Sequence, residues 1–192
     1  LVLARAEGPY LSRVPRLVRV VDLKAFRVLA SLPGLVRYIQ RERPFALLSA
    51  LHHANVVALW ARKLASVPVR VVVSVHTNLS RATANAPNLR ARIMPRWIRL
   101  FYPWADAIVA VSSGVAEDLV RHTGIPPEKI HVIYNPVVTP DLFVRAEEPI
   151  EHPWFAPGQC PVVLGVGRLT PSKDFSTLIR AFALVRKVRA AR

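Results

Sequence analysis

Two basic residues near the end of the chain have the clearest chemical potential. In the stretch GVGRLTPSKDF, Arg168 follows Gly167, and Lys173 stands just before an amphipathic helical pattern. Cations beside a helix N-terminus form an anion site, because N–H groups and the helix dipole add to their charge. A diphosphate suits this pair, with Arg as a planar fork and Lys as a mobile point charge. The residues alone support solvated loop cations equally well.

Glycines and histidines supply the other candidates. Gly165 and Gly167 lack side chains, so a ligand could approach their backbone. His76 directly follows the apolar run VVVSV and could donate to a developing charge or hold a substrate hydroxyl at the mouth of a cleft. For an isolated histidine, capping the strand end or partial burial in the core is the favoured interpretation. His52 and His53 are adjacent, so at most one of them could serve the same cleft.

Other polar positions favour structural roles. Ser112 and Ser113 precede GVAEDLV and predict a helix N-cap, with Glu117 and Asp118 favourably near that helix's dipole. The chain has no G-x-S-x-G elbow, no P-loop and no carboxylate pair with an arguable spacing. No third ligand with zinc spacing accompanies the two adjacent histidines.

Short apolar runs alternate with helical patterns along the chain, which is typical of a doubly wound α/β fold with a parallel sheet. Most of the runs are continuously apolar, which predicts strands covered on both faces. In such folds ligands bind outside the carboxyl ends of the strands. The predicted strands are 1–4, 18–23, 46–51, 69–75, 107–112, 129–134 and 162–167. The predicted helices are 34–43, 54–65, 113–124 and 174–188, the last with a buried stripe of Phe175, Leu178, Ile179, Phe182, Val185 and Val188.

The Pro-rich segment 136–161 interrupts this alternation and has no clear period. Such a change in composition indicates a linker between domains. We therefore predict a first domain at 1–135, a linker at 136–161 and the start of a second domain at 162–192.

The overall composition is that of a globular protein, with 52% hydrophobic and 20% charged residues. The net charge of +15 comes mostly from Arg spread along the whole chain, which favours solvated helix faces and an Arg-rich codon bias over a nucleic-acid surface. Cys160 is the single cysteine, which excludes an internal disulfide and fits a reducing, cytoplasmic setting. No apolar run reaches the roughly 18 residues of a membrane-spanning helix.

Segment 90–104 mixes arginines with aromatic residues. This composition suits a peripheral contact with anionic lipid headgroups. A short helix whose aromatic side chains pack on the sheet, with solvated arginines, is slightly favoured. The residues are Arg90, Arg92, Arg96, Arg99, Trp97, Phe101, Tyr102 and Trp104.

Two long stretches carry a family resemblance. ADAIVAVSSGVAEDLVRHTGIPPEKIHVIYNPV and VVLGVGRLTPSKDFSTLIRAFALVR resemble family 4 glycosyltransferases of the GT-B fold. RAEGPYL, LLSALHHANVVA and EHPWF are similar to bacterial members that build lipopolysaccharide, capsule or other cell-surface glycans. The resemblance implies two Rossmann-like domains that face each other, the first binding an acceptor and the second a nucleotide-sugar donor.

The resemblance also implies roles for single residues. Arg168 and Lys173 match the pair that contacts the donor diphosphate, and Gly167 matches the glycine before that Arg. His76 matches the histidine near the transferred sugar. Asn78 is a further candidate for the cleft, although relatives place the Asn directly after the His, and here Thr77 intervenes. His53 is a candidate as well.

The implied reaction is a retaining, front-face sugar transfer with no protein nucleophile and no metal, at the inner face of the cytoplasmic membrane, on a lipid-linked or cell-surface glycan. The family's first strand with its glycine-rich loop, and the paired glutamates of its donor domain, have no counterpart between Leu1 and Arg192. We therefore expect the chain by itself to be inactive. The alternatives are another GT-B enzyme such as a sugar-nucleotide epimerase, or a non-catalytic basic module that binds nucleic acid or lipid.

Overall fold

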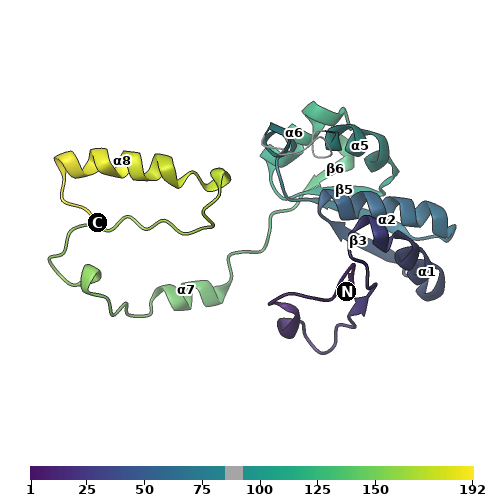
Figure 1. Cartoon of the computed structure of the whole chain (residues 1–192), viewed down its shortest axis with the longest axis horizontal. Helices are drawn as coiled ribbons and strands as arrows, with labels where there is room; N and C mark the ends of the chain where they lie inside the picture. Colours follow the sequence, from purple (N-terminus) through teal and green to yellow (C-terminus); the bar gives the residue numbers. More distant parts are fainter. Residues whose placement is uncertain (85–92) are drawn as a thin grey trace. The chain divides into compact units, whose positions relative to one another are not determined.

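The computed structural model describes residues 1–84 and 93–192. The chain forms two compact units, Leu1–Asn135 and Pro136–Arg192 (Figure 1).

The first unit is built on a four-stranded parallel sheet with the strand order β3-β4-β5-β6. The strands are β3 (Ala46–Ala50), β4 (Arg70–Val75), β5 (Ala107–Ala110) and β6 (Ile130–Val132). In the register, Val73 lies between Ser49 on β3 and Ile108 on β5. All four were predicted from apolar runs, which in β4, β5 and β6 contain the β-branched residues that fit a pleated and buried surface.

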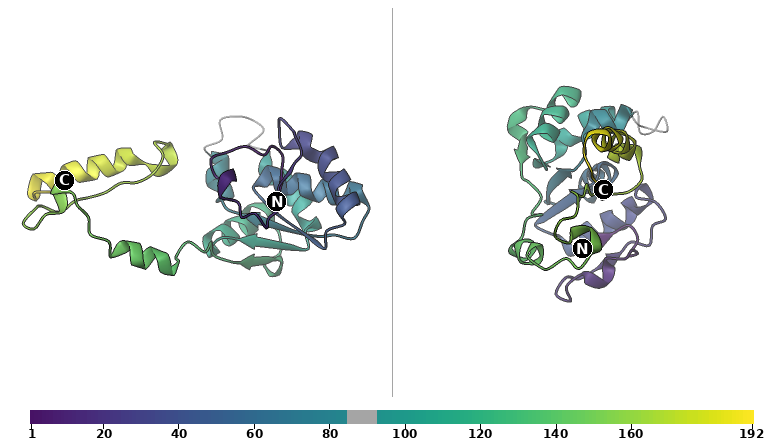
Figure 2. Two further views of the ribbon diagram at one scale, coloured as in Figure 1. Left: turned by 90° about the horizontal axis from the view of Figure 1, so that it is seen from below. Right: turned by 90° about the vertical axis from the view of Figure 1, so that its left-hand side faces the viewer.

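Helices follow the strands and alternate with them, as Figures 1 and 2 show. They are α1 (Leu32–Glu42), α2 (His52–Ala65), α3 (Leu79–Ala84), α5 (Met94–Phe101) and α6 (Ser113–Thr123). Short 3-10 turns lie at Leu11–Arg13, Leu29–Ser31, Tyr102–Trp104 and Pro127–Lys129. The Ser112 hydroxyl accepts a 3.2 Å hydrogen bond from the Val115 N–H, so its predicted role as the N-cap of α6 is confirmed. The alternation of parallel strands and helices confirms the predicted α/β, Rossmann-like class.

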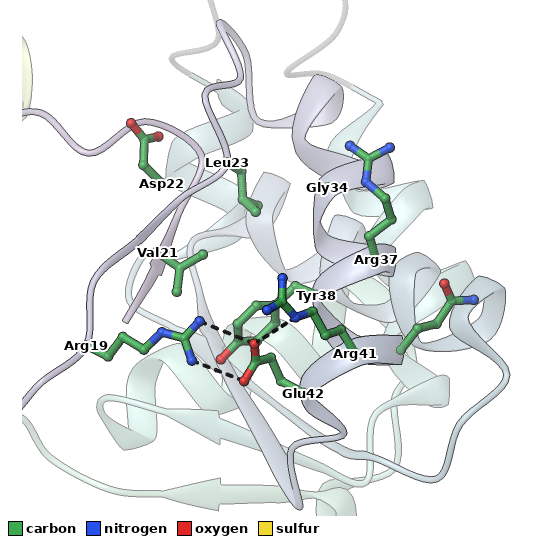
Figure 3. A pocket seen from close by; sticks show the side chains of 10 residues that line it. Arg19, Val21, Asp22, Leu23, Gly34, Arg37, Tyr38, Arg41 and Glu42 are labelled. Carbon is green, nitrogen blue, oxygen red and sulfur yellow. Dashed lines mark hydrogen bonds and ion pairs between the residues drawn. The ribbon is translucent and has the colours of Figure 1, made fainter.

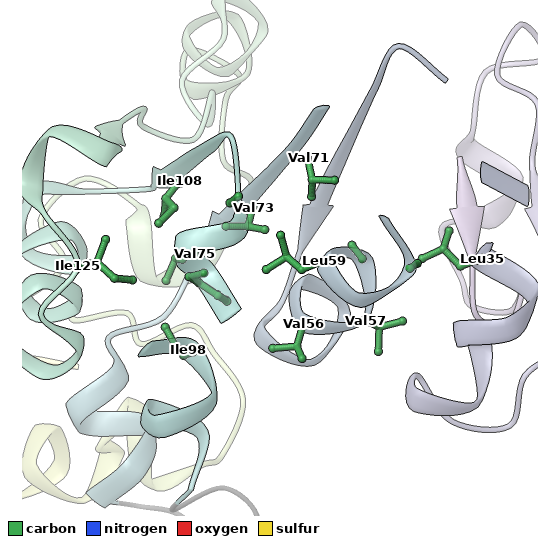
Figure 4. Close-up of a cluster of buried hydrophobic side chains, with 14 of the residues drawn as sticks. Leu35, Val56, Val57, Leu59, Val71, Val73, Val75, Ile98, Ile108 and Ile125 are labelled. Carbon is green, nitrogen blue, oxygen red and sulfur yellow. The ribbon is translucent and has the colours of Figure 1, made fainter. Parts of the chain in front are cut away.

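The core is built around α2 and β4 and includes residues of α1, α5 and α6 (Figure 4). Leu59 of α2 and Val71 and Val73 of β4 are completely buried there. The face of the sheet on which Leu48 of β3 lies is less covered, since this side chain is 70% exposed. The prediction that the strands are covered on both faces is therefore wrong for β3 in the described part of the chain: a continuous apolar run does not show which faces neighbours cover.

The N-terminal strands form a separate two-stranded parallel sheet. β1 (Val2–Leu3) pairs with β2 (Val21–Asp22), so that Val2 lies opposite Val21. Both runs were predicted as strands, and each pairs over only two residues.

The second unit differs from its prediction in its linker segment, in its first strand and in the burial of its last helix. Segment 136–161 contains a helix, α7 (Pro140–Ala146), and a 3-10 turn at Pro153–Phe155. The strand predicted at 162–167 is not formed, because a strand needs a partner and none of the described residues pairs along this segment. Two backbone hydrogen bonds join the start of this segment to the last residue: the Val163 N–H donates to the Arg192 carbonyl at 2.7 Å, and the Arg192 N–H donates to the Pro161 carbonyl at 2.9 Å.

The last helix, α8 (Phe175–Val188), is confirmed. It follows a 3-10 turn at Pro171–Lys173. Its predicted stripe is not buried: Phe175 and Phe182 are half-buried, and Val188 is 88% exposed. Apolar spacing identifies the face of a helix, but a sheet must lie beside that face to bury it.

Candidate functional site

His76 stands at the carboxyl end of β4, where ligands of parallel sheets bind. The His76 ring is exposed, and its Nε2 lies 3.0 Å from the hydroxyl oxygen of Ser74, a largely buried residue of β4. The sequence left open whether His76 serves a cleft or caps the strand through the backbone. Its ring bonds to a side-chain hydroxyl, so one nitrogen is fixed while the residue stays accessible.

The turn after His76 is tied down by two side chains. Oδ1 of Asn78 accepts hydrogen bonds from the Ser80 hydroxyl at 2.6 Å and from the Arg81 N–H at 3.3 Å. Oδ2 of Asp118 accepts from the N–H groups of Leu79 at 2.6 Å and Ser80 at 3.0 Å. The structure therefore uses Asn78 as a cap of α3, and its amide oxygen is already engaged.

The sequence suggested that Asp118 lies near the N-terminal end of its own helix, where the helix dipole favours a carboxylate. Asp118 does not lie there. It lies in the middle of α6, where it is only 6% exposed, and it serves α3 instead. Burial by itself would raise the pKa of its carboxyl. Hydrogen bonds from Ser80 and the Leu79 N–H, together with the nearby His122, outweigh burial and lower the pKa. The carboxylate is therefore ionised at neutral pH.

A buried polar network lies beneath the same end of β4. Nδ2 of Asn55 donates to the Ser74 carbonyl and to the Tyr102 hydroxyl, each at 2.9 Å. The Tyr102 hydroxyl lies 3.0 Å from Nδ1 of His52. Together with the bond from Ser74 to His76, this network connects the N-terminal turn of α2 to the exposed histidine.

The Tyr102 hydroxyl is the centre of this network. Its oxygen accepts from Asn55, and it shares a second hydrogen bond with Nδ1 of His52, in which the donor is set by the tautomer of the imidazole. Burial, and to a lesser degree His53, lowers the pKa of His52, whereas burial raises the pKa of Tyr102. Nε2 of His52 and Oδ1 of Asn55 are buried and have no hydrogen-bond partner among the described residues.

His53, the other histidine of the pair, is exposed at the start of α2. The two rings therefore face different ways, as expected for adjacent residues: His52 reaches the buried Tyr102 hydroxyl, and His53 is exposed. Leu51, just before the helix, has φ +77° and ψ +135°, a region that residues with a side chain rarely occupy. This strained turn lies at the carboxyl end of β3, and nothing in the sequence indicated it.

The second unit carries the predicted diphosphate site. Arg168 and Lys173 are both exposed, and the carbon chain of Lys173 lies against Gly167, where an added Cβ would be 3.4 Å from its Cγ. Asp174 caps α8 by accepting a 3.2 Å bond from the Thr177 N–H. The N-terminus of α8, which the sequence predicted as part of an anion site, is thus partly occupied by the carboxylate of Asp174.

Gly165 has a different role from the one expected. A Cβ built on it would lie 2.7 Å from Cε1 of Phe175 and 2.9 Å from Cδ2 of Leu178. The missing side chain therefore lets α8 pack against this backbone, and the approach of a ligand is not needed to explain Gly165. Gly167 stays a candidate for contact with a donor.

The aromatic residues of segment 90–104 pack inward, with α2 as the partner of their rings, whereas the favoured interpretation named the sheet. Trp97 and Phe101 contact the ring of Trp60 on α2 at centroid distances of 5.4 and 5.1 Å, tilted and edge-on respectively, and Tyr102 is completely buried. Arg96 and Arg99 are exposed on α5. Arg90 and Arg92 lie outside the described residues.

An open groove of about 640 Å³ lies between the N-terminal segment and α1 (Figure 3). Arg19 forms a bidentate pair with Glu42 across it, at 3.1 and 3.2 Å. Arg37 and Arg41 also line the groove. None of the predicted site residues does, so the groove is separate from the carboxyl edge of the sheet.

Among the described residues, no three His, Cys, Asp or Glu side chains are grouped so that they could hold a metal ion. In the same part of the chain, no helix is long and apolar enough to cross a bilayer.

Comparisons with known proteins give one family match and several relatives. The model of the family described as Glycosyltransferase Family 4 matches residues 2–140. An N-acetylgalactosamine-N,N'-diacetylbacillosaminyl-diphospho-undecaprenol 4-alpha-N-acetylgalactosaminyltransferase of Campylobacter jejuni is 32% identical over 133 residues, which cover 69% of this chain and 34% of the relative. The alpha-maltose-1-phosphate synthase of Mycolicibacterium smegmatis is 33% identical over 87 residues, which cover 40% of this chain and 21% of the relative.

Among solved structures, the apo form of the lipopolysaccharide outer core galactosyltransferase WaaB is similar, with a TM-score of 0.47 and 20% identity. That match covers 64% of this chain and 32% of the other. The chain thus spans about a third of the length of these relatives, or less.

Proposed function

Because this chain belongs to glycosyltransferase family 4, we propose that the protein transfers a sugar from a nucleotide-sugar donor to a lipid-linked or cell-surface glycan, with retention of the anomeric configuration. The observation that carries the proposal is the family match, which extends over residues 2–140. Family membership, together with the parallel strands and alternating helices, also confirms the predicted GT-B type of Rossmann-like fold.

The donor diphosphate is assigned to Arg168 and Lys173. The transfer breaks the bond between the sugar C1 and the diphosphate oxygen and forms a bond from C1 to the acceptor oxygen on the same face. The acceptor proton passes to the departing diphosphate. Negative charge therefore grows on the diphosphate, and a guanidinium with an ammonium group stabilises it. The backbone of Gly167 allows close approach.

His76 is assigned to the transferred sugar. The Ser74 hydroxyl engages Nε2 of its ring, which leaves Nδ1 for a sugar hydroxyl or for the charge that develops at the reacting carbon. The exposed His53 and the half-buried Asn78 are assigned as further substrate contacts of the first unit. This chemistry requires neither a metal nor another cofactor.

The acceptor class is supported by the Campylobacter relative, whose name specifies a diphospho-undecaprenol-linked saccharide. The polyprenyl chain of such an acceptor stays in the membrane. We therefore place the enzyme in the cytoplasm, on the inner face of the membrane. We propose no nucleic-acid partner for this reaction.

A peripheral membrane contact through α5 goes with this proposal. Arg96, Arg99 and the 62%-exposed Leu100 lie outside the packed aromatic residues, so cations and an apolar side chain meet on one surface. Vesicles with anionic lipid should bind the protein, and the double variant Arg96→Gln/Arg99→Gln should bind several-fold more weakly. The matched control is Arg37→Gln/Arg41→Gln on α1. Equal losses in both variants would contradict a specific contact.

The activity test uses the full-length protein, a panel of radiolabelled nucleotide sugars and a polyprenyl-diphosphate-linked saccharide. We expect acceptor-dependent transfer of label, an α-linked product from an α-linked donor, and turnover that persists in EDTA. An epimerised nucleotide sugar formed without acceptor would support the epimerase alternative. Steeply salt-dependent binding to DNA or RNA without transfer would support the basic binding module.

A further inference from the structure

The turn that carries His76 is held by a carboxylate from another part of the sheet. His76 follows β4, while Asp118 lies on α6, which follows the neighbouring strand β5. Oδ2 of Asp118 reaches the N–H groups of Leu79 and Ser80, at 2.6 and 3.0 Å. Only Thr77 and Asn78 separate His76 from the first of these contacts.

A buried carboxylate in the middle of a helix is costly unless it is well bonded. Asp118 is one of three buried residues of α6, together with Leu119 and Thr123, and an apolar residue would be expected at a buried position in the middle of a helix. Its hydrogen bonds compensate for its burial, and its lowered pKa keeps it charged. The Asp118 carboxylate therefore stabilises the start of α3 and is not explained by the stability of α6.

α3 needs this support because it has only six residues. A helix of this length is unstable by itself, since forming its first turn fixes several dihedral angles for one hydrogen bond. With Asp118 bound to its first N–H groups and Asn78 bound to the next, the start of α3 is fixed. The chain direction after His76 is fixed with it.

We propose that Asp118 is a positioning residue for His76, acting through the backbone of Leu79 and Ser80. The inference rests on the proposed function, in which His76 acts at the transferred sugar. Asp118 itself touches no substrate. Its effect is geometric: displacement of a reacting group by about 1 Å can lower turnover about 100-fold. Ser74 fixes the His76 ring, and Asp118 fixes the turn that follows His76.

Asp106 provides a matched control, because it binds the backbone of β4 at the end opposite to His76. Its carboxylate accepts a 2.6 Å bond from the Val71 N–H near the start of β4 and pairs with Arg62. Like Asp118, Asp106 binds a backbone N–H of the region around β4. Asp106→Asn should therefore weaken folding without moving the turn that carries His76.

The experiment compares Asp118→Asn with Asp106→Asn in the full chain. The imidazole ¹H–¹⁵N signals of His76 should shift in the first variant and stay in the second. In the full-length enzyme, Asp118→Asn should lower kcat by about 10- to 100-fold, with the donor KM changed less than about twofold. In a His76→Ala background it should lower kcat no further than Asp106→Asn does.

Unchanged His76 signals in folded Asp118→Asn, or equal shifts in both variants, would overturn the proposal. If Asp118→Asn does not fold, Asp118→Glu keeps a carboxylate one methylene further out and should still shift the His76 signals; unchanged signals there would also overturn it. Absence of sugar transfer by the wild type would count against the proposed function alone, because the ring signals would still report whether Asp118 fixes His76.

Discussion

The side-chain amide of Asn55 donates a 2.9 Å hydrogen bond to the hydroxyl of Tyr102, and both side chains are completely buried. The two residues are 47 positions apart in the sequence. The bond joins α2 to the turn that follows α5, directly beneath the carboxyl end of β4. The polar groups under the proposed catalytic histidine are thus part of the fold's own core.

Tyr102→Phe should destabilise the first unit by about 1–3 kcal/mol, because the change leaves His52 and one donor of Asn55 buried without a partner. Urea unfolding followed by circular dichroism measures the effect. Tyr134→Phe, at a 67%-exposed position, is the control and should be neutral. Equal stability of the two variants would contradict the network.

Stability should fall as the pH drops below about 6.5. The pKa of His52 is lowered from 6.5 by burial first and by His53 second, so the unfolded chain binds a proton that the folded chain does not. The unfolding free energy is therefore highest above this value and declines as the pH falls toward the folded pKa. His52→Gln should flatten the profile below about pH 6.5, measured by urea unfolding at each pH. A slope unchanged by that substitution would refute the assignment.

Gly165→Ala should loosen α8. Its Cβ would lie 2.7 Å from the Phe175 ring, so the helix must shift. Faster amide hydrogen exchange along α8 is the expected sign. Gly114→Ala, in α6, meets nothing within 4 Å and should be neutral or stabilise by up to about 1 kcal/mol. Unchanged exchange in Gly165→Ala would show that the packing is not tight.

Leu51→Gly should stabilise the first unit by about 1 kcal/mol, since φ +77° with ψ +135° strains any residue with a side chain. Leu51 is also 67% exposed, so little burial is lost. Thermal unfolding measures the change. A lower melting temperature would mean that the Leu51 side chain contributes more than the strain costs.

The parallel sheet and its main helices were predictable, because each rests on local patterns. Val71, Val73 and Val75 lie in one β-branched run, and the serine before α6 is a strong cap signal. The strand at 162–167 was predicted from the same kind of run and does not form, since pairing depends on a neighbour that local sequence does not contain.

The site was less predictable. His76 was identified from its place after a strand, but its supports come from distant segments: Asp118 is 42 positions further along the chain. One signal was present in the sequence, because Asn55 stands among apolar residues within ANVVALWARKLA, where a buried polar side chain needs a partner. Asp118 follows Glu117 in a polar part of its helix, so its burial was not indicated. In neither case does the local sequence name the partner, which only the tertiary fold supplies.

The most direct test of the central claim is the turnover of Arg168→Gln and Lys173→Gln in the full-length protein, measured as release of nucleoside diphosphate in the presence of acceptor. If these cations stabilise the departing diphosphate, each change should lower kcat/KM by about 100-fold or more, while the circular dichroism spectrum stays unchanged. Arg180→Gln, on the exposed surface of α8, should retain activity. Turnover like that of the wild type in both Arg168→Gln and Lys173→Gln would contradict the account.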